Sequence, residues 1–135
     1  MNLVASAEIP EIIAQLQVSA KEGNASILTI AQDGSPDAEG IRLQFSIDHG
    51  VVGLDWVLLG HRNVADQSRI AEMAAALGYQ VEERDLEQVR YLRMTGQGIA
   101  ELGTAIIRDF YGINPATRIP MLTVGFKWDP EAHWN

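Results

Sequence analysis

The sequence predicts an α+β domain, with helices packed on a mainly antiparallel sheet. Of the 135 residues, 47% are hydrophobic, which is enough for a sizeable buried core. Segments with helical spacing alternate with segments of strand spacing, and short turns join most neighbouring strands. We find neither an internal repeat nor a linker long enough to divide the chain, so residues 1–135 are expected to form one domain.

The chain begins with a predicted helix and a predicted strand. Glu8 to Lys21 has its apolar residues on one helical stripe, and Pro10 fits the first turn, where a missing N–H costs nothing. The stripe consists of Ile9, Ile12, Ile13, Leu16 and Ala20. Gly23 and Asn24 form a stop signal, and the short β-branched segment 25–31 predicts a strand.

The next two segments predict a hairpin. Ile41 to Ile47 alternates apolar and polar residues, as expected for an antiparallel strand with one solvated face. Residues 48–50 form a tight turn, and Val51 to Leu59 follows with two mostly apolar faces. This second strand should therefore be covered on both sides, or lie partly at an interface.

Two helices and three strands follow. The helices are predicted at 63–77 and 98–111, and the strands at 79–84, 89–94 and 121–128. Asn63 is expected to cap the first of these helices, with Asp66 three residues on in a capping box. Gly78 and Gly112 suit the left-handed positions that end helices.

The predicted order is α-β-β-β-α-β-β-α-β, and it leaves an alternative open. From residue 51 the order β-α-β-β-α-β also fits a ferredoxin-like split βαβ fold. In that fold the strand 51–59 would lie between two later strands. A hairpin with 41–47 takes one of those places, and we favour the hairpin because the turn at 48–50 is short.

The charge balance limits the partners. Eighteen acidic residues stand against ten basic ones, a net charge of −8. This field repels phosphate backbones and anionic lipid, so we expect neither a nucleic-acid nor a membrane partner. No apolar run reaches the roughly 20 residues of a membrane span, and Met1 to Pro10 lacks the basic start of a signal peptide. We therefore expect a cytoplasmic protein.

The common catalytic motifs are missing, which favours a non-enzymatic role and leaves a small enzyme as the alternative. Cysteine is absent, and neither a Gly-x-Ser-x-Gly elbow nor a His-Glu-x-x-His motif occurs. Gly96-Gln97-Gly98 follows a strand and opens a helix, but Glu101 takes the place of the third glycine of a dinucleotide fingerprint. We therefore expect no nucleotide cofactor.

The positions of the carboxylates and histidines also argue against a metal site. His49 and His61 flank Asp55, but they lie at opposite ends of the strand 51–59. At about 3.3 Å per residue the two histidines are too far apart to share an ion. The acidic run Glu82, Glu83, Asp85 and Glu87 is interpreted as a solvated edge that discourages strand-on-strand aggregation.

Six residues are candidates for contact with a partner or ligand. Trp128 and Trp134 are the better candidates for exposed contact residues, since tryptophan is enriched at the centres of interfaces. Trp56 shares a face with Leu54 and Leu58, which favours core packing. A pocket near the end of strand 51–59 would be lined by Asp55, Trp56, His61 and Arg62.

The element order, size and acidity resemble the type III secretion chaperone fold and its bacterial chaperone-like relatives outside secretion systems. The resemblance covers Ile9 to Tyr111 and implies a homodimer that binds a partner chain along sheet and helix surfaces, without chemistry. The strand 121–128 departs from that pattern, and no site residues carry over.

Taken together, these features predict a non-enzymatic protein-binding module, chaperone-like or regulatory, acting as a cytoplasmic homodimer. The alternative is a small-molecule-binding protein or small enzyme with a pocket between the sheet and the helices, near the end of strand 51–59. A deep pocket that holds Asp55 beside an arginine would favour this alternative. An immunity protein that neutralises a toxin also fits the acidity and size.

Overall fold

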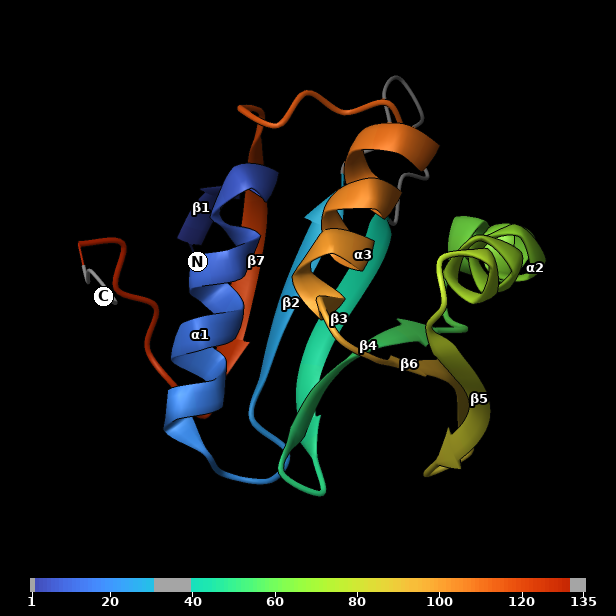
Figure 1. Ribbon diagram of the computed structural model, residues 1–135, viewed down its shortest axis with the longest axis horizontal. Helices are drawn as coiled ribbons and strands as arrows, with labels where there is room; N and C mark the ends of the chain where they lie inside the picture. Colours follow the sequence, from blue (N-terminus) through green and yellow to red (C-terminus); the bar gives the residue numbers. More distant parts are fainter. Residues whose placement is uncertain (1, 31–39, 132–135) are drawn as a thin grey trace.

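A seven-stranded antiparallel sheet organises the structure, a computed structural model that describes residues 2–30 and 40–131 (Figure 1). The strand order is β1-β7-β2-β3-β4-β6-β5. The strands are β1 (Asn2–Ala5), β2 (Ala25–Ile30), β3 (Ile41–Asp48), β4 (Val51–Val57), β5 (Gln80–Leu86), β6 (Val89–Thr95) and β7 (Arg118–Val124). The mixture of helices with one antiparallel sheet confirms the predicted α+β class.

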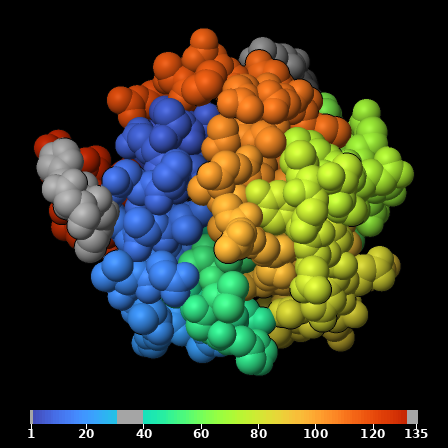
Figure 2. Space-filling view, viewed as in Figure 1, coloured from blue at the N-terminus to red at the C-terminus, as the bar shows by residue number. Residues whose placement is uncertain are grey.

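The described helices pack on one face of this sheet, which we call the helical face (Figures 1 and 2). They are the 3₁₀ turn η1 (Ser6–Glu8), α1 (Ile9–Ser19), α2 (His61–Ala76), α3 (Ile99–Ala105) and the π-helical turn η2 (Ile106–Phe110). Helices α1 and α3 lie side by side, and α2 lies against β3, β4 and β5. None of the helices in the described ranges is long and apolar enough to cross a membrane.

The core lies between the helices and the sheet. Alternation along each strand sends one set of apolar side chains into it, among them Leu43, Phe45, Leu54 and Met94. Helix α3 approaches β3 closely at Gly103, where an added Cβ atom would lie 2.5 Å from the Phe45 ring. A glycine at this position therefore sets the spacing between helix and sheet.

The predicted hairpin is confirmed. Strands β3 and β4 pair directly, with Gln44 opposite Asp55 and Asp48 opposite Val51. On its other side β4 pairs with β6. The ferredoxin-like alternative is wrong, because it requires two later strands beside β4 and β3 takes one of those places. From Val52 to Trp56 both faces of β4 are buried, as the sequence predicts, whereas Val51 at its start is exposed.

The ends of the chain differ from the prediction. Strand β1 was not predicted, because four residues are too few for a periodic signal. The last strand covers 118–124 instead of 121–128. Pro120 lies within this strand, where it pairs only with Leu3 of β1, and the ladder with β2 begins at Met121. A proline there removes no hydrogen bond from the β2 ladder.

The start of α2 also corrects the prediction. The helix begins at His61, and Asn63 lies within it, without a capping hydrogen bond. The Asn63 side chain instead accepts the Arg42 backbone N–H at 3.1 Å and donates to the Arg42 carbonyl at 2.9 Å. The β3–β4 register runs only from Gln44 onward, so β4 does not serve these groups. Asn63 takes the role of a neighbouring strand at Arg42.

Candidate functional site

The outer face of the sheet, opposite the helical face, is the candidate functional surface. Within residues 2–30 and 40–131 it carries no helix. Exposed large apolar side chains on or beside it are Leu3, Val51, Leu59, Leu86, Leu122 and Val124. The other exposed large apolar side chains, Val18, Val64 and Leu77, belong to α1, α2 and the end of α2. A gathering of this kind marks an interaction surface.

Two hollows lie on the outer face. The first, here the Asp55 hollow, has a volume of about 440 Å³ and is bounded by the β3–β4 and β5–β6 hairpins. The second, the Arg42 hollow, has a volume of about 420 Å³ and lies over β2, β3 and β7, with Val57 and Leu59 along one side. Gln44 and Val57 line both, so the hollows adjoin. Volumes of this size are typical of ligand sites.

The floor of the Asp55 hollow is a buried ion pair. Asp55 and Arg93 lie opposite each other on β4 and β6, and only 4% and 3% of their surfaces are exposed. Arg93 Nη1 donates to Asp55 Oδ1 at 3.0 Å. The other carboxylate oxygen accepts hydrogen bonds from Ser46 Oγ at 2.5 Å and Gln44 Nε2 at 3.1 Å. The buried carboxylate is therefore fully paired, as burial of a charge requires.

Arg93 also holds the strands together. Its guanidinium donates to the Ser46 hydroxyl and carbonyl and to the Val51 carbonyl at 2.8–3.3 Å. It lies across Gly53, where an added Cβ atom would be 2.6 Å from Arg93 Cζ. Gly53 thus gives Arg93 the room to cover the outer side of β4. The floor is polar and neutralised, and none of the described residues that line the hollow is a histidine that could complete a Ser-His-Asp arrangement.

The rim of the Asp55 hollow is acidic. Glu22, Asp48 and Glu87 line it, together with apolar Leu86 and Val89. The hydrogen bonds that Arg84 and His49 make to Asp48 hold the pKa of that carboxyl below its usual value. Asp48 is therefore ionised at neutral pH and pairs with Arg84, and Glu22 and Glu87 give the rim its net negative charge.

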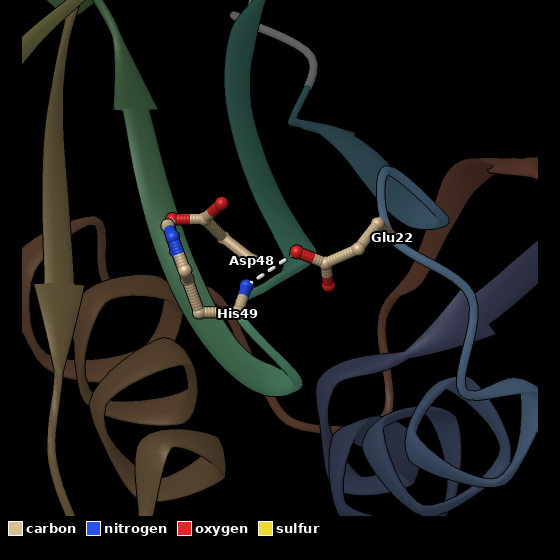
Figure 3. A group of neighbouring side chains, drawn as sticks. All are labelled: Glu22, Asp48 and His49. Atoms are coloured by element: carbon tan, nitrogen blue, oxygen red, sulfur yellow. Dashed lines mark hydrogen bonds and ion pairs between the residues drawn. The ribbon is translucent and has the colours of Figure 1, made fainter.

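One group on this rim has the composition of a metal site (Figure 3). Glu22, Asp48 and His49 offer ligand atoms within 4.8 Å of one another. Glu22, however, accepts the backbone N–H groups of His49 and Gly50, at 2.5 and 3.1 Å. Asp48 is engaged by Arg84 and by His49 Nδ1. We interpret the group as a clamp on the hairpin turn, since its acceptors are already occupied.

The four residues of the predicted pocket do not come together. Asp55 and Trp56 are neighbours in a strand, so they face opposite sides of the sheet. Trp56 is buried on the helical face and donates from Nε1 to the Asn63 carbonyl at 2.9 Å. Arg62 lies over the Tyr111 ring, on the helical face as well, and His61 is exposed at the start of α2. Only Asp55 reaches the outer face.

The C-terminal tryptophans also differ from the prediction. Trp128 was expected to be exposed, but only 6% of it is, and it belongs to the core. The segment is held to α1 because Gln15 donates to the Asp129 carbonyl at 2.6 Å and accepts its backbone N–H at 2.9 Å. Trp134 lies outside the described residues.

The structure also contains a polar cluster on the helical face that the sequence did not predict. Buried Asp66 receives hydrogen bonds from Tyr111 at 2.8 Å, Arg69 at 2.7 Å and Arg62 at 3.3 Å. Burial opposes the ionisation of Asp66, but these hydrogen bonds and charges outweigh it and hold its pKa below the usual value. Burial and Asp66 together raise the pKa of Tyr111. The cluster fastens α2 to the end of η2.

The residues that build the outer-face hollows were also missed, although a signal for them exists. Arg42, Gln44 and Ser46 are the polar side of an alternating strand, and Arg93 interrupts the apolar run 92–94. The acidic run around Glu82 does lie on an edge strand, as predicted, because β5 is last in the sheet.

Comparison of the chain with protein-family models, curated proteins and solved structures finds no match.

Proposed function

We propose that the protein is a non-enzymatic binding module that holds a segment of a partner protein on its outer face. One observation carries the proposal: this sheet face has no helix over it within the described residues, yet it displays most of the exposed large apolar side chains. Leaving such a face in water is costly, and contact with a partner removes that cost.

The charge of the Asp55 hollow favours one kind of segment. Its rim carries Glu22, Asp48 and Glu87 beside Leu86 and Val89. An apolar segment with lysine or arginine at its flank fits this combination, because the apolar part covers the leucine and valine and the cation faces the carboxylates. The net charge of −8 steers the same class of partner toward the protein.

This proposal retains the chaperone-like or regulatory role in the cytoplasm and the homodimer that the sequence predicts. The homodimer is tested independently of the partner. Light scattering coupled to size-exclusion chromatography should give twice the chain mass of 14.8 kDa at micromolar concentration. A single-chain mass up to high concentration would contradict it.

The experiment that tests the proposal compares two matched variants. Leu86→Glu changes a side chain that is 65% exposed on the Asp55 hollow, and Val18→Glu changes one that is 61% exposed on α1. Tagged wild-type protein and both variants are incubated with native lysate and cross-linked, and the captured chains and cross-link positions are read by mass spectrometry.

We expect one partner captured by the wild type and by Val18→Glu but lost with Leu86→Glu. Its cross-links should lie at the rim of the Asp55 hollow. A partner that all three proteins retain equally, or cross-links confined to the helices, would overturn the proposal.

A second function has an observation in its favour. The sequence-predicted alternative places a small-molecule pocket near the end of strand 51–59, and the Arg42 hollow is lined by Val57 and Leu59 there. This pocket lies on the outer face and not between sheet and helices. We propose small-molecule binding at the Arg42 hollow as the second candidate function.

A further inference from the structure

In the part of the chain that the structure describes, the Arg42 hollow combines a mostly apolar lining with one charged side chain. Its walls are Ile27, Thr29, Gln44, Val57, Leu59, Pro120 and Leu122, contributed by four neighbouring strands and the segment after β4. Among the described residues that line the hollow, Arg42 is the one that carries a charge. A mostly apolar wall with a few polar groups, one of them charged, is the usual composition of a small-ligand site.

Arg42 is held at this position from its backbone. Ile41 and Leu43 on either side are fully buried, so alternation directs Arg42 to the outer face. Asn63 binds both the N–H and the carbonyl of Arg42, which fixes the strand where β4 does not pair with it. The base of the side chain is thereby fixed against the apolar wall.

The Arg42 guanidinium makes no ion pair or hydrogen bond with a residue in 2–30 or 40–131, whereas Arg84 and Arg93 on the same face are both paired. The neighbouring Gln44 amide is already committed to Asp55. Arg42 is thus the cation on the outer face that is available to an anion within the described chain.

From these contacts we infer that the Arg42 hollow binds a small carboxylate with an apolar tail, of the medium-chain fatty-acid type. The carboxylate pairs with the Arg42 guanidinium, which suits carboxylate geometry, and the tail lies over Val57 and Leu122. The volume of about 420 Å³ accommodates a chain of this size. The inference rests on the second proposed function and adds the chemical class of its ligand.

The adjacent Asp55 hollow is unsuited to the same ligand. Its rim carries Glu22, Asp48 and Glu87, and the positive charge of Arg93 is neutralised by Asp55. A carboxylate there would face like charges. The charge pattern therefore orients the ligand, with its head at Arg42 and its tail along the apolar wall.

The test is titration calorimetry with decanoate and with decanol, each below its aggregation concentration. We expect one decanoate per chain. Arg42→Gln should weaken decanoate binding about threefold to tenfold, since a partly exposed charge pair contributes modestly. Arg42→Lys should retain most of the affinity, and decanol should bind Arg42→Gln and wild type alike.

Two controls localise the effect. Arg90→Gln changes another exposed arginine of the sheet, whose partner is Glu83, and should leave decanoate affinity unchanged. Leu122→Glu should remove binding of both probes, because it places a charge on the apolar wall. Circular dichroism and melting temperature establish that each variant is folded.

The possible outcomes distinguish the carboxylate assignment from the more general proposal that the Arg42 hollow binds a small molecule. Equal affinity of wild type and Arg42→Gln for decanoate would overturn the carboxylate assignment while decanol binding still supported the pocket. If neither probe binds the wild type, or if binding survives Leu122→Glu, the small-molecule function at this hollow fails as well.

Discussion

Arg93 is the residue on which the polar floor of the outer face depends. It neutralises Asp55 and joins Ser46 to Val51 through its guanidinium, so three strands share one side chain. A buried pair of this kind contributes little by comparison with an apolar pair, but removal of one partner leaves an uncompensated charge.

Arg93→Met should therefore lower the free energy of unfolding by about 3–5 kcal/mol, measured by urea denaturation. The double variant Asp55→Leu, Arg93→Met should recover part of this loss, because no buried charge remains. Arg90→Met on the same strand should change stability by less than about 1 kcal/mol, since its partner Glu83 is exposed. A loss no larger for Arg93 than for Arg90 would contradict the assigned role.

Asp66 gives the protein an acid-sensitive contact. Its folded-state pKa lies below the ordinary value of 3.8, so the folded protein favours the ionised form. The resulting stabilisation is fully present above about pH 4 and is lost as the pH falls through the folded-state pKa.

Asp66→Asn should thus cost about 1–3 kcal/mol at pH 7, and the difference from wild type should narrow below pH 4. Urea titrations at pH 7, 5 and 3 measure this. Glu72→Gln, on the exposed side of α2, controls for removal of one surface charge. A difference that stays constant across this range would show that the Asp66 carboxylate is not the titrating group.

At the scale of the element, two side chains hold helix α2 in its position on the sheet. Its Asn63 completes the hydrogen bonds of β3, and its Asp66 binds the end of η2 through Tyr111. Asn63→Ala should leave the Arg42 backbone groups without partners and cost about 1–3 kcal/mol.

Amide hydrogen exchange is the sharper measurement for Asn63. The Arg42 amide should exchange faster in Asn63→Ala, together with amides at the start of α2. Gln67→Ala, which removes only a local bond to the Val64 carbonyl, should leave Arg42 unchanged. Unchanged exchange at Arg42 in both variants would mean that the asparagine does not replace a strand there.

Local patterns predicted most elements, because each carries its own period. The alternation in 41–47 and the stripe in 9–20 depend only on which residues face the core. Asn63 and Trp128 show where this reasoning stops. The helix cap at Asn63 and the strand through Trp128 were predicted from neighbouring residues alone. In the structure Asn63 binds Arg42, and the segment that follows Trp128 binds Gln15. A local periodic pattern does not report contacts between residues so far apart in the sequence. The site was missed for the same reason, since Asp55 meets Arg93 only through the β4–β6 register.

At the scale of the whole molecule, the two faces of the sheet differ in what they show to water. The helical face is covered, whereas the outer face presents Leu86 and Leu122 in its two hollows and Val124 on β7. A native protein with such a face should bind apolar dyes without unfolding.

We expect the folded protein to enhance the fluorescence of anilinonaphthalene sulfonate at neutral pH. Leu122→Glu should lower this fluorescence at least twofold at equal protein concentration, and Val18→Glu should leave it near the wild-type level. Dye fluorescence that is insensitive to Leu122→Glu would place the exposed apolar surface elsewhere.

Among the described strands β7 comes last in sequence, yet it lies between β1, which comes first, and β2. During synthesis the hairpins β3–β4 and β5–β6 can close as soon as they leave the ribosome, because their partners are adjacent in sequence. The slot between β1 and β2 stays vacant until Arg118–Val124 emerges. Until then the β2 edge is open to strands of other nascent chains, and arrival of the final strand ends that exposure.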